Sequence, residues 1–365
     1  MPWTASAAHS TIAEQNHNNP AQFVMILTDY LERTWSGVSR SALLGTLLGA
    51  AYGLLARLLI ETKFAAFFAL ISISFLILIP FAIGYLAVLP AKNPRWWYRI
   101  FVPWIPVATA IGGSIVTGWE GAICVIMSAP LLLIMASVGG LLGGADGSRR
   151  PQHAAVIAVL PFLMGPVEAL TKAPVRVERN VTETVIDAPA SVVWRHVIEV
   201  PEITVQEWQG AFYTRIGFPR PLSATLSREG AGGVRRATFA GGVLFLEEVV
   251  AWEPERRIAF TIDAQTDSIP PHTLDQHVTI GGRYFDVLDG EYRLEPLDDA
   301  RTRVILTSRH RVSTTLNVYT SLWARAIMRS IQGSILDVVK RRAEADAMGD
   351  RSRGQQRFEG NWQGY

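Results

Sequence analysis

The sequence contains a single cysteine, Cys124, among its 365 residues. One cysteine excludes an intrachain disulfide and a metal site built from several thiolates. Cys124 lies inside an apolar run, so cysteine usage gives no indication of the cellular compartment. No Gly-x-Ser-x-Gly stretch occurs either, which excludes the strand-to-helix turn of a serine hydrolase.

Charged residues are scarce, at 18% of the chain against 49% apolar residues. The scarcity is confined to residues 41–170, whereas from Thr171 onward acids and bases recur every few positions. This split predicts a membrane domain followed by a water-exposed domain. The net charge of +2 is small. No basic cluster is interleaved with aromatic residues, so we expect no nucleic-acid partner.

Long uncharged runs predict four or five membrane-spanning helices, at about 42–60, 64–89, 101–118, 121–144 and 154–170. The run Phe64–Leu89 is longer than a helix needs to cross a ~30 Å hydrocarbon core. The last run is the weakest, because it spans only when extended to Leu170 with Glu168 near the interface. Residues 1–40 precede the spans, and there helical spacing of apolar residues predicts an interfacial amphipathic helix or a helix packed on the bundle. Its apolar residues are Phe23, Ile26, Leu27, Tyr30, Leu31 and Trp35.

Lysine and arginine collect before the first predicted span, after the second and after the fourth. The positive-inside rule therefore predicts a cytoplasmic N-terminus. Five spans would place the C-terminal domain outside the cytoplasm, and four would leave it in the cytoplasm. The basic residues are Arg33, Arg40, Lys92, Arg95, Arg99, Arg149 and Arg150.

The fourth run contains two overlapping pairs of glycines four residues apart, Gly139 with Gly143 and Gly140 with Gly144. Such pairs let helices approach closely, so they predict tight helix packing. They are also the feature that favours an alternative function, a sensor or scaffold whose helices form an oligomer or bind a membrane partner.

The second half alternates strand-like and helical patterns. "VTETVIDAPASVVWRHVIEV" predicts a strand and a helix that begins near Pro189 and buries Val193, Trp194 and Val197. "GVRRATFAGGVLFLEEVVAWEP" predicts a hairpin at Gly241–Gly242. "RRIAFTIDA" and a pair joined at "EPLDDARTR" add further strands. A long helix from about Thr315 to Ala347 then gives an α+β domain whose helix packs across a curved sheet. The polar tail 348–365 is predicted to be disordered.

In order and spacing these elements resemble the START-like, helix-grip superfamily (SRPBCC) of polyketide cyclases, dehydratases and lipid-transfer proteins. The resemblance rests on "VIDAPASVVWRHVIEV", "EEVVAWEPERRIAFTI", "YRLEPLDDARTRVILTS" and the final helix, and it covers residues 175–347. It implies a sheet wrapped round the last helix, with an apolar cavity for a hydrophobic small molecule or lipid. It implies no particular reaction, because one scaffold supports binders, carriers and enzymes.

Eight aromatic residues of this domain are the candidates for the cavity wall, and simple core packing is the alternative. They are Trp194, Trp208, Phe212, Phe239, Phe245, Tyr292, Tyr319 and Trp323.

Three residues are the candidates for acid–base catalysis. If Tyr292 faces inward, the two-residue period of a strand also turns Asp286 and His310 inward, although a bulge would expose them. Glu247 or its neighbour Glu248 must also face inward. An inward glutamate opposite Arg235 or Arg236 would favour a buried ion pair over a catalytic acid.

His272, His277 and Asp275 lie close in sequence, but their spacing does not fit a helical zinc site. We therefore expect no metal and no cofactor. The leading hypothesis is a membrane-anchored protein that binds or transfers a hydrophobic, lipid-derived small molecule. A cyclase- or dehydratase-like enzyme is the alternative from another functional class.

Overall fold

The computed structural model describes residues 40–59, 71–118, 121–146, 150–265 and 280–360, with side chains described to residue 350. The chain divides into two compact units. One comprises Met1–Ala65, Ile77–Ala110 and Leu131–Leu163, and the other comprises Ala66–Leu76, Ile111–Pro130 and Met164–Tyr365. The predicted amphipathic helix before Arg40 lies outside the described residues, as does the segment that contains His272, Asp275 and His277.

Four of the described helices are long and apolar enough to cross a membrane. They are the helix Arg40–Leu59, the pair α4 (Trp96–Phe101) and α5 (Trp104–Val116), α6 (Ala122–Ala145) and α7 (Pro151–Leu170). The run predicted to be weakest therefore forms a helix of sufficient length. Within it, the Glu168 carboxylate accepts hydrogen bonds of 2.9 Å from the backbone N–H groups of Ile73 and Ser74.

At the predicted second span, the helix that the structure describes is shorter than the predicted run 64–89. Its described part is the π-helical turn η3 (Ser74–Leu78) followed by α3 (Ile79–Val88), while residues 60–70 lie outside the described residues. A helix over Ser74–Val88 is below the length expected for a full crossing. The side of the membrane on which the C-terminal domain lies stays a prediction.

Glycines bring the helices of the first unit into backbone contact, as the paired glycines predict. A Cβ atom on Gly139 would lie 2.0 Å from the Phe81 carbonyl oxygen, and one on Gly140 would lie 2.1 Å from the Arg99 carbonyl oxygen. On the facing helix α3, a Cβ on Gly84 would lie 1.9 Å from the Ala136 carbonyl oxygen of α6. The glycine surfaces of α6 are thus covered by α3 and α4 of the same chain, and they lend no support to a separate partner helix.

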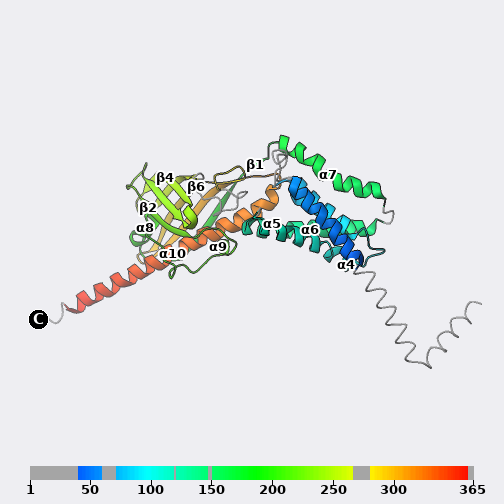
Figure 1. Cartoon of the computed structure of the whole chain (residues 1–365). Helices are drawn as coiled ribbons and strands as arrows, with labels where there is room; N and C mark the ends of the chain where they lie inside the picture. Colours follow the sequence, from blue (N-terminus) through cyan, green and yellow to red (C-terminus); the bar gives the residue numbers. More distant parts are fainter. Residues whose placement is uncertain (1–39, 60–70, 119–120, 147–149, 266–279, 361–365) are drawn as a thin grey trace, which may run out of the picture. The chain divides into compact units, whose positions relative to one another are not determined.

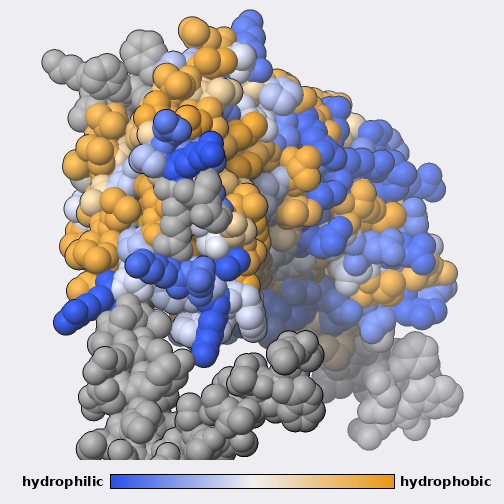
Figure 2. Space-filling view, turned by 90° about the vertical axis from the view of Figure 1, so that its right-hand side faces the viewer, coloured by the Kyte–Doolittle hydropathy of each residue, from blue (hydrophilic) through white to orange (hydrophobic). Residues whose placement is uncertain are grey.

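Large apolar side chains are exposed along these helices, and Figure 2 shows wide hydrophobic areas on the helical face turned to the viewer. A water-soluble protein rarely exposes such surface, because its hydration is unfavourable. Examples at helical spacing are Leu43, Leu47, Leu54 and Leu58 on the first helix and Val156, Leu163 and Val167 on α7.

The second unit contains a seven-stranded antiparallel sheet with the strand order β1-β7-β6-β5-β4-β3-β2. The sheet curls around the long helix α10, Asn317–Gly360 (Figure 1). This is the predicted helix-grip architecture. The strands are β1 (Val175–Ile186), β2 (Pro221–Leu226), β3 (Val234–Phe239), β4 (Leu244–Glu253), β5 (Arg257–Ala264), β6 (Phe285–Asp298) and β7 (Arg301–Ser313).

Two departures from the sequence-based prediction concern weak local signals. Strand β2 is not among the predicted strands, because its sequence PLSATL mixes small and polar residues, yet it pairs with β3 with one register shift between Pro221 and Ser223. Helix α10 continues past the predicted end at Ala347 to Gly360, so the tail to that residue is helical rather than disordered. Extending an existing helix adds a hydrogen bond for each residue fixed, which favours continuation over a new start.

The predicted hairpin between β3 and β4 turns through the 3-10 segment η4 (Ala240–Gly242). Gly241 and Gly242 have φ angles of 71° and 83°, a region in which glycine is unstrained. Helix α8 (Ala190–Ile198) follows Pro189 as expected, and the single turn α9 (Phe212–Arg215) lies between α8 and β2.

One end of the sheet is filled by α8 and the later part of α10. Trp194 of α8 meets Trp252 of β4 edge to face, with ring centroids 5.1 Å apart. Leu336 and Val339 of α10 belong to the same buried cluster. This end is a packed core, so space for a ligand is left at the earlier part of α10.

The glycine contacts of the first unit predict that Gly84→Ala lowers its stability. The added Cβ would overlap the Ala136 carbonyl unless α3 and α6 separate, and overpacking of this kind costs about 1–3 kcal/mol. The control is Gly112→Ala in α5, where a Cβ meets no atom within 4 Å. Thermal unfolding of the full chain in detergent should show a lower midpoint for Gly84→Ala than for the wild type. The midpoint of Gly112→Ala should be unchanged. Equal midpoints would contradict close packing at Gly84.

Candidate functional site

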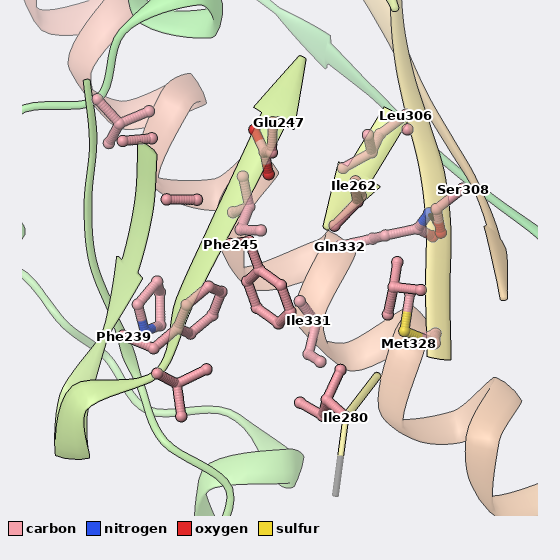
Figure 3. Close-up of a pocket in the computed structure, with 18 of the residues that line it drawn as sticks. Phe239, Phe245, Glu247, Ile262, Ile280, Leu306, Ser308, Met328, Ile331 and Gln332 are labelled. Atoms are coloured by element: carbon pink, nitrogen blue, oxygen red, sulfur yellow. Dashed lines mark hydrogen bonds between the residues drawn. The ribbon is translucent and has the colours of Figure 1, made fainter. Parts of the chain in front are cut away.

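A cavity of about 150 Å³ lies between the concave face of the sheet and α10 (Figure 3). Its wall is mainly apolar. Phe239 and Phe245 meet edge to face at one side, with ring centroids 5.3 Å apart. Met328 and Ile331 of α10 face them, and Figure 3 shows these side chains pointing into the same space. Further apolar residues of the wall are Ile203, Phe218, Ala237, Phe260, Ile262, Ile280, Phe285, Val287, Leu306, Ile327, Ile335 and Val338.

A buried ion pair forms one polar part of this wall. Arg235 of β3 and Glu247 of β4 are directly opposite in the strand register, and Arg235 Nη1 donates a hydrogen bond to Glu247 Oε2. Both residues are buried and both line the cavity. The prediction that an inward Glu247 would pair with Arg235 is therefore confirmed, while Glu248 on the next position is exposed.

Other groups around Arg235 also contact its guanidinium. Arg235 Nε donates to the Ile198 carbonyl oxygen at 3.2 Å, and the guanidinium carbon lies 5.7 Å from the centre of the Phe260 ring. Burial acts to lower the pKa of Arg235, but Glu247 and a hydrogen bond with Tyr292 outweigh it, so the pKa is raised. Burial raises the pKa of Tyr292, which stays a neutral phenol. The cluster is an internally neutralised charge pair with a phenol beside it.

A second polar group lies where α10 meets β7. Gln332 Nε2 donates to Ser308 Oγ at 2.9 Å, and Gln332 Oε1 accepts from Thr182 Oγ1 at 2.7 Å. Ser308 and Gln332 both line the cavity (Figure 3). Elsewhere on the wall, burial raises the pKa of the Tyr213 hydroxyl to about 12, an effect that Ser334 opposes.

Of the eight predicted aromatic residues, Phe239, Phe245 and Tyr292 line the cavity. The others lie elsewhere in the domain: Trp194 belongs to the packed core, Phe212 is 45% exposed, and the Tyr319 hydroxyl donates to the Met127 carbonyl oxygen. Trp208 and Trp323 are partly buried and pack against the buried apolar cluster that contains Phe245, but they do not line the cavity. These five residues do not line the cavity, so a role for them in ligand binding stays a prediction.

Several lining residues were not among the candidates. Phe260 lies on β5, where Ile258, Phe260 and Ile262 alternate with other residues in a way that the sequence displays. Phe285 lies at the start of β6, and the alternation counted from Tyr292 would turn it outward. Ser308 lies on β7 two residues before His310, so the strand alternation that turns His310 inward also turns Ser308 inward. Gln332 gives no such signal, because a polar residue on a long helix usually faces water.

Asp286 and His310 do not converge, and the expected inward orientation of Asp286 is wrong. A bulge between Val287 and Asp289 adds one residue to β6 and reverses its alternation. Asp286 is therefore absent from the cavity wall and lies 4.0 Å from Arg311, and burial raises its pKa against the effect of that arginine.

His310 does face inward and is fully buried, but it lies behind the cavity wall. Its ring is 5.6 Å from that of Phe285, and its Nε2 is 3.7 Å from Glu178 Oε2. Burial lowers the pKa of His310, and Glu178 opposes this effect. The catalytic roles suggested for Asp286, His310 and Glu247 stay predictions, and two of the three residues do not reach the cavity.

Within the part of the chain that the structure describes, no group of three or more histidine, cysteine, aspartate or glutamate side chains is arranged to hold a metal ion. The segment with His272, Asp275 and His277 is outside that part.

Comparisons with known proteins find solved structures with a similar fold to the C-terminal half of this chain. No family model and no curated protein matches the sequence. Among solved structures, a protein from Thermus thermophilus matches with a TM-score of 0.31 and 19% identity over 47% of this chain and 99% of that chain. The Zhui aromatase/cyclase from a Streptomyces species matches with a TM-score of 0.28 and 17% identity over 46% and 94%. A norcoclaurine synthase from Thalictrum flavum matches with a TM-score of 0.30 and 11% identity over 47% and 96%.

The buried ion pair predicts an asymmetric response to substitution. Glu247→Leu leaves the Arg235 guanidinium buried without its carboxylate, which should cost about 3–5 kcal/mol of unfolding free energy. The double variant Arg235→Met, Glu247→Leu removes both charges and should recover most of that loss. Thermal unfolding of the three proteins in the same detergent measures the difference. A double variant less stable than the single one would contradict a desolvated pair.

Proposed function

We propose that this chain is a membrane-anchored protein whose C-terminal domain binds a hydrophobic small molecule between the sheet and α10. The observation that carries the proposal is the apolar cavity described above, closed on one side by Phe239 and Phe245 and on the other by Met328 and Ile331. Ligand sites are concave and mostly apolar, with a few polar groups that orient the ligand. The Ser308–Gln332 and Arg235–Glu247 pairs are such groups.

The volume of the cavity favours a compact ligand. An apolar cavity of about 150 Å³ holds a molecule about the size of one aromatic ring. Each Å² of apolar ligand surface removed from water contributes about 25 cal/mol, so a ligand of one ring gains enough to bind without an ion pair of its own. A lipid-derived ligand would therefore be a small product or fragment, or would require the cavity to widen.

The apolar helices support the anchoring part of the proposal. Four helices have the length and composition of spans, and their exposed leucines and valines would meet lipid in place of water. A hydrophobic ligand dissolves in a bilayer far better than in water. A binding domain fixed to the membrane could then exchange its ligand over a short aqueous path.

An acid–base enzyme is the alternative, and one observation favours it: Glu247 and Tyr292 are ionisable groups on the same wall of the cavity. A general acid or base must exchange a proton with the ligand. Glu247 instead accepts a hydrogen bond from Arg235, and that arginine also bonds Tyr292. These contacts favour a structural role for the cluster and binding as the function of the cavity.

Filling the cavity tests the binding function. A ligand that binds only the folded state raises the unfolding temperature, so saturating toluene should raise that of the full-length wild type in detergent. Ile331→Trp places an indole in the cavity and should abolish the rise. The control Val318→Trp makes a similar change on the same helix at a side chain that is 76% exposed, and it should keep the rise. An equal rise in both variants would contradict binding between α10 and the sheet.

A further inference from the structure

The Ser308 hydroxyl has a hydrogen that no acceptor takes among the residues the structure describes. A serine hydroxyl carries one donor hydrogen and two acceptor lone pairs. Ser308 Oγ accepts from Gln332 Nε2 at 2.9 Å. The direction of that bond is set by the Asn180 carbonyl oxygen, which can only accept and lies 3.5 Å from Gln332 Nε2, so the amide nitrogen is on the side of Ser308 and the amide oxygen accepts from Thr182. Ser308 is therefore left as a donor on the cavity wall.

The residues on either side of Ser308 in the sheet strengthen this assignment. On β1 the opposite residue is Asn180, whose buried Nδ2 also has no hydrogen-bond partner in the described structure. On β6 the opposite residue is Gly290. The Phe260 ring lies over Gly290, because a Cβ there would be 2.6 Å from the ring. The Ser308 donor thus lies on the cavity wall beside an aromatic surface, and a buried donor without an acceptor is costly to leave unsatisfied.

Most other polar groups of the wall are already engaged, and one exception is the Tyr213 hydroxyl, which has no hydrogen-bond partner among the described residues. Ser223 Oγ and Thr238 Oγ1 are hydrogen-bonded at 2.7 Å, and Arg235 is bound by Glu247 and Tyr292. A ligand acceptor would gain little at these positions, since it would have to displace an existing partner. The donor capacity that remains on the cavity wall therefore lies at the Ser308 hydroxyl, beside Gln332, and at the Tyr213 hydroxyl.

We propose that the cavity selects a compact apolar molecule carrying one hydrogen-bond acceptor oxygen, such as the carbonyl of a one-ring ketone, which accepts from the Ser308 hydroxyl. This assignment rests on the proposed binding function and adds the chemical class of the ligand. A hydrocarbon of equal shape fills the same space and leaves the Ser308 donor unpaired.

A matched pair of probes tests the proposal. Acetophenone carries a carbonyl oxygen where α-methylstyrene carries a methylidene group, and the two have nearly the same shape. Dissociation constants for both are measured by calorimetry on the full-length protein in lipid nanodiscs, with protein-free nanodiscs as the blank. Ser308→Ala is compared with Ser223→Ala, which removes the same atom from the same cavity at a hydroxyl paired with Thr238.

We expect Ser308→Ala to weaken acetophenone binding about fivefold, the effect of one net hydrogen bond, and to leave α-methylstyrene binding unchanged. Ser223→Ala should change the ratio of the two constants by less than this. A Ser308→Ala variant that weakens both probes equally, or neither, overturns the assignment of the donor while the binding function stands. If neither probe binds wild type, the proposed binding function is overturned and the ligand class with it.

Discussion

The packing of α10 along the concave face of the sheet is the interaction on which the C-terminal domain depends. The later part of the helix, with Leu336 and Val339, meets α8 and fills its end of the sheet completely. The earlier part faces β2 to β7 across side chains that do not fill the curve, and the cavity is the space that remains. Because one helix serves both ends, the packed end can supply the stability that an incompletely filled end forgoes.

Desolvation then decides how polar groups are arranged around that space. Arg235 and Glu247 are buried, and each would be costly alone, so they face each other across neighbouring strands. Gln332 is buried on a helix that could have carried an apolar residue, and all its contacts run to Thr182, Ser308 and the Asn180 carbonyl. Ser308 keeps a hydrogen without an acceptor among the described residues. A polar network of this kind orients one donor inside an otherwise apolar wall.

Much of the fold follows from local patterns in the sequence. The helix after Pro189, the glycine hairpin and the pairing of β6 with β7 were predictable because each depends on residues close in sequence. The Arg235–Glu247 pair was predictable for a similar reason, since a hairpin register links its two strands. The close helix approach at Gly139 and Gly140 followed from their spacing.

The candidate site was less predictable, because its geometry depends on contacts distant in sequence. Strand alternation placed Ser308 and His310 inward but failed for Asp286, since one extra residue at a bulge reverses every side chain beyond it. Aromatic content indicated a cavity wall, but Trp194 fills the packed end instead. Which end of the sheet stays open depends on how far α10 and α8 reach, and no short segment encodes that.

The central claim is that a membrane-anchored chain holds a small apolar ligand beside α10. Native mass spectrometry of the full-length protein, released by mild detergent from a washed membrane fraction, tests it most directly. The account predicts recovery from the membrane fraction and a small-molecule adduct that is retained in Val318→Trp and lost in Ile331→Trp. Recovery in the soluble fraction, or an adduct of equal abundance in both variants, would contradict it.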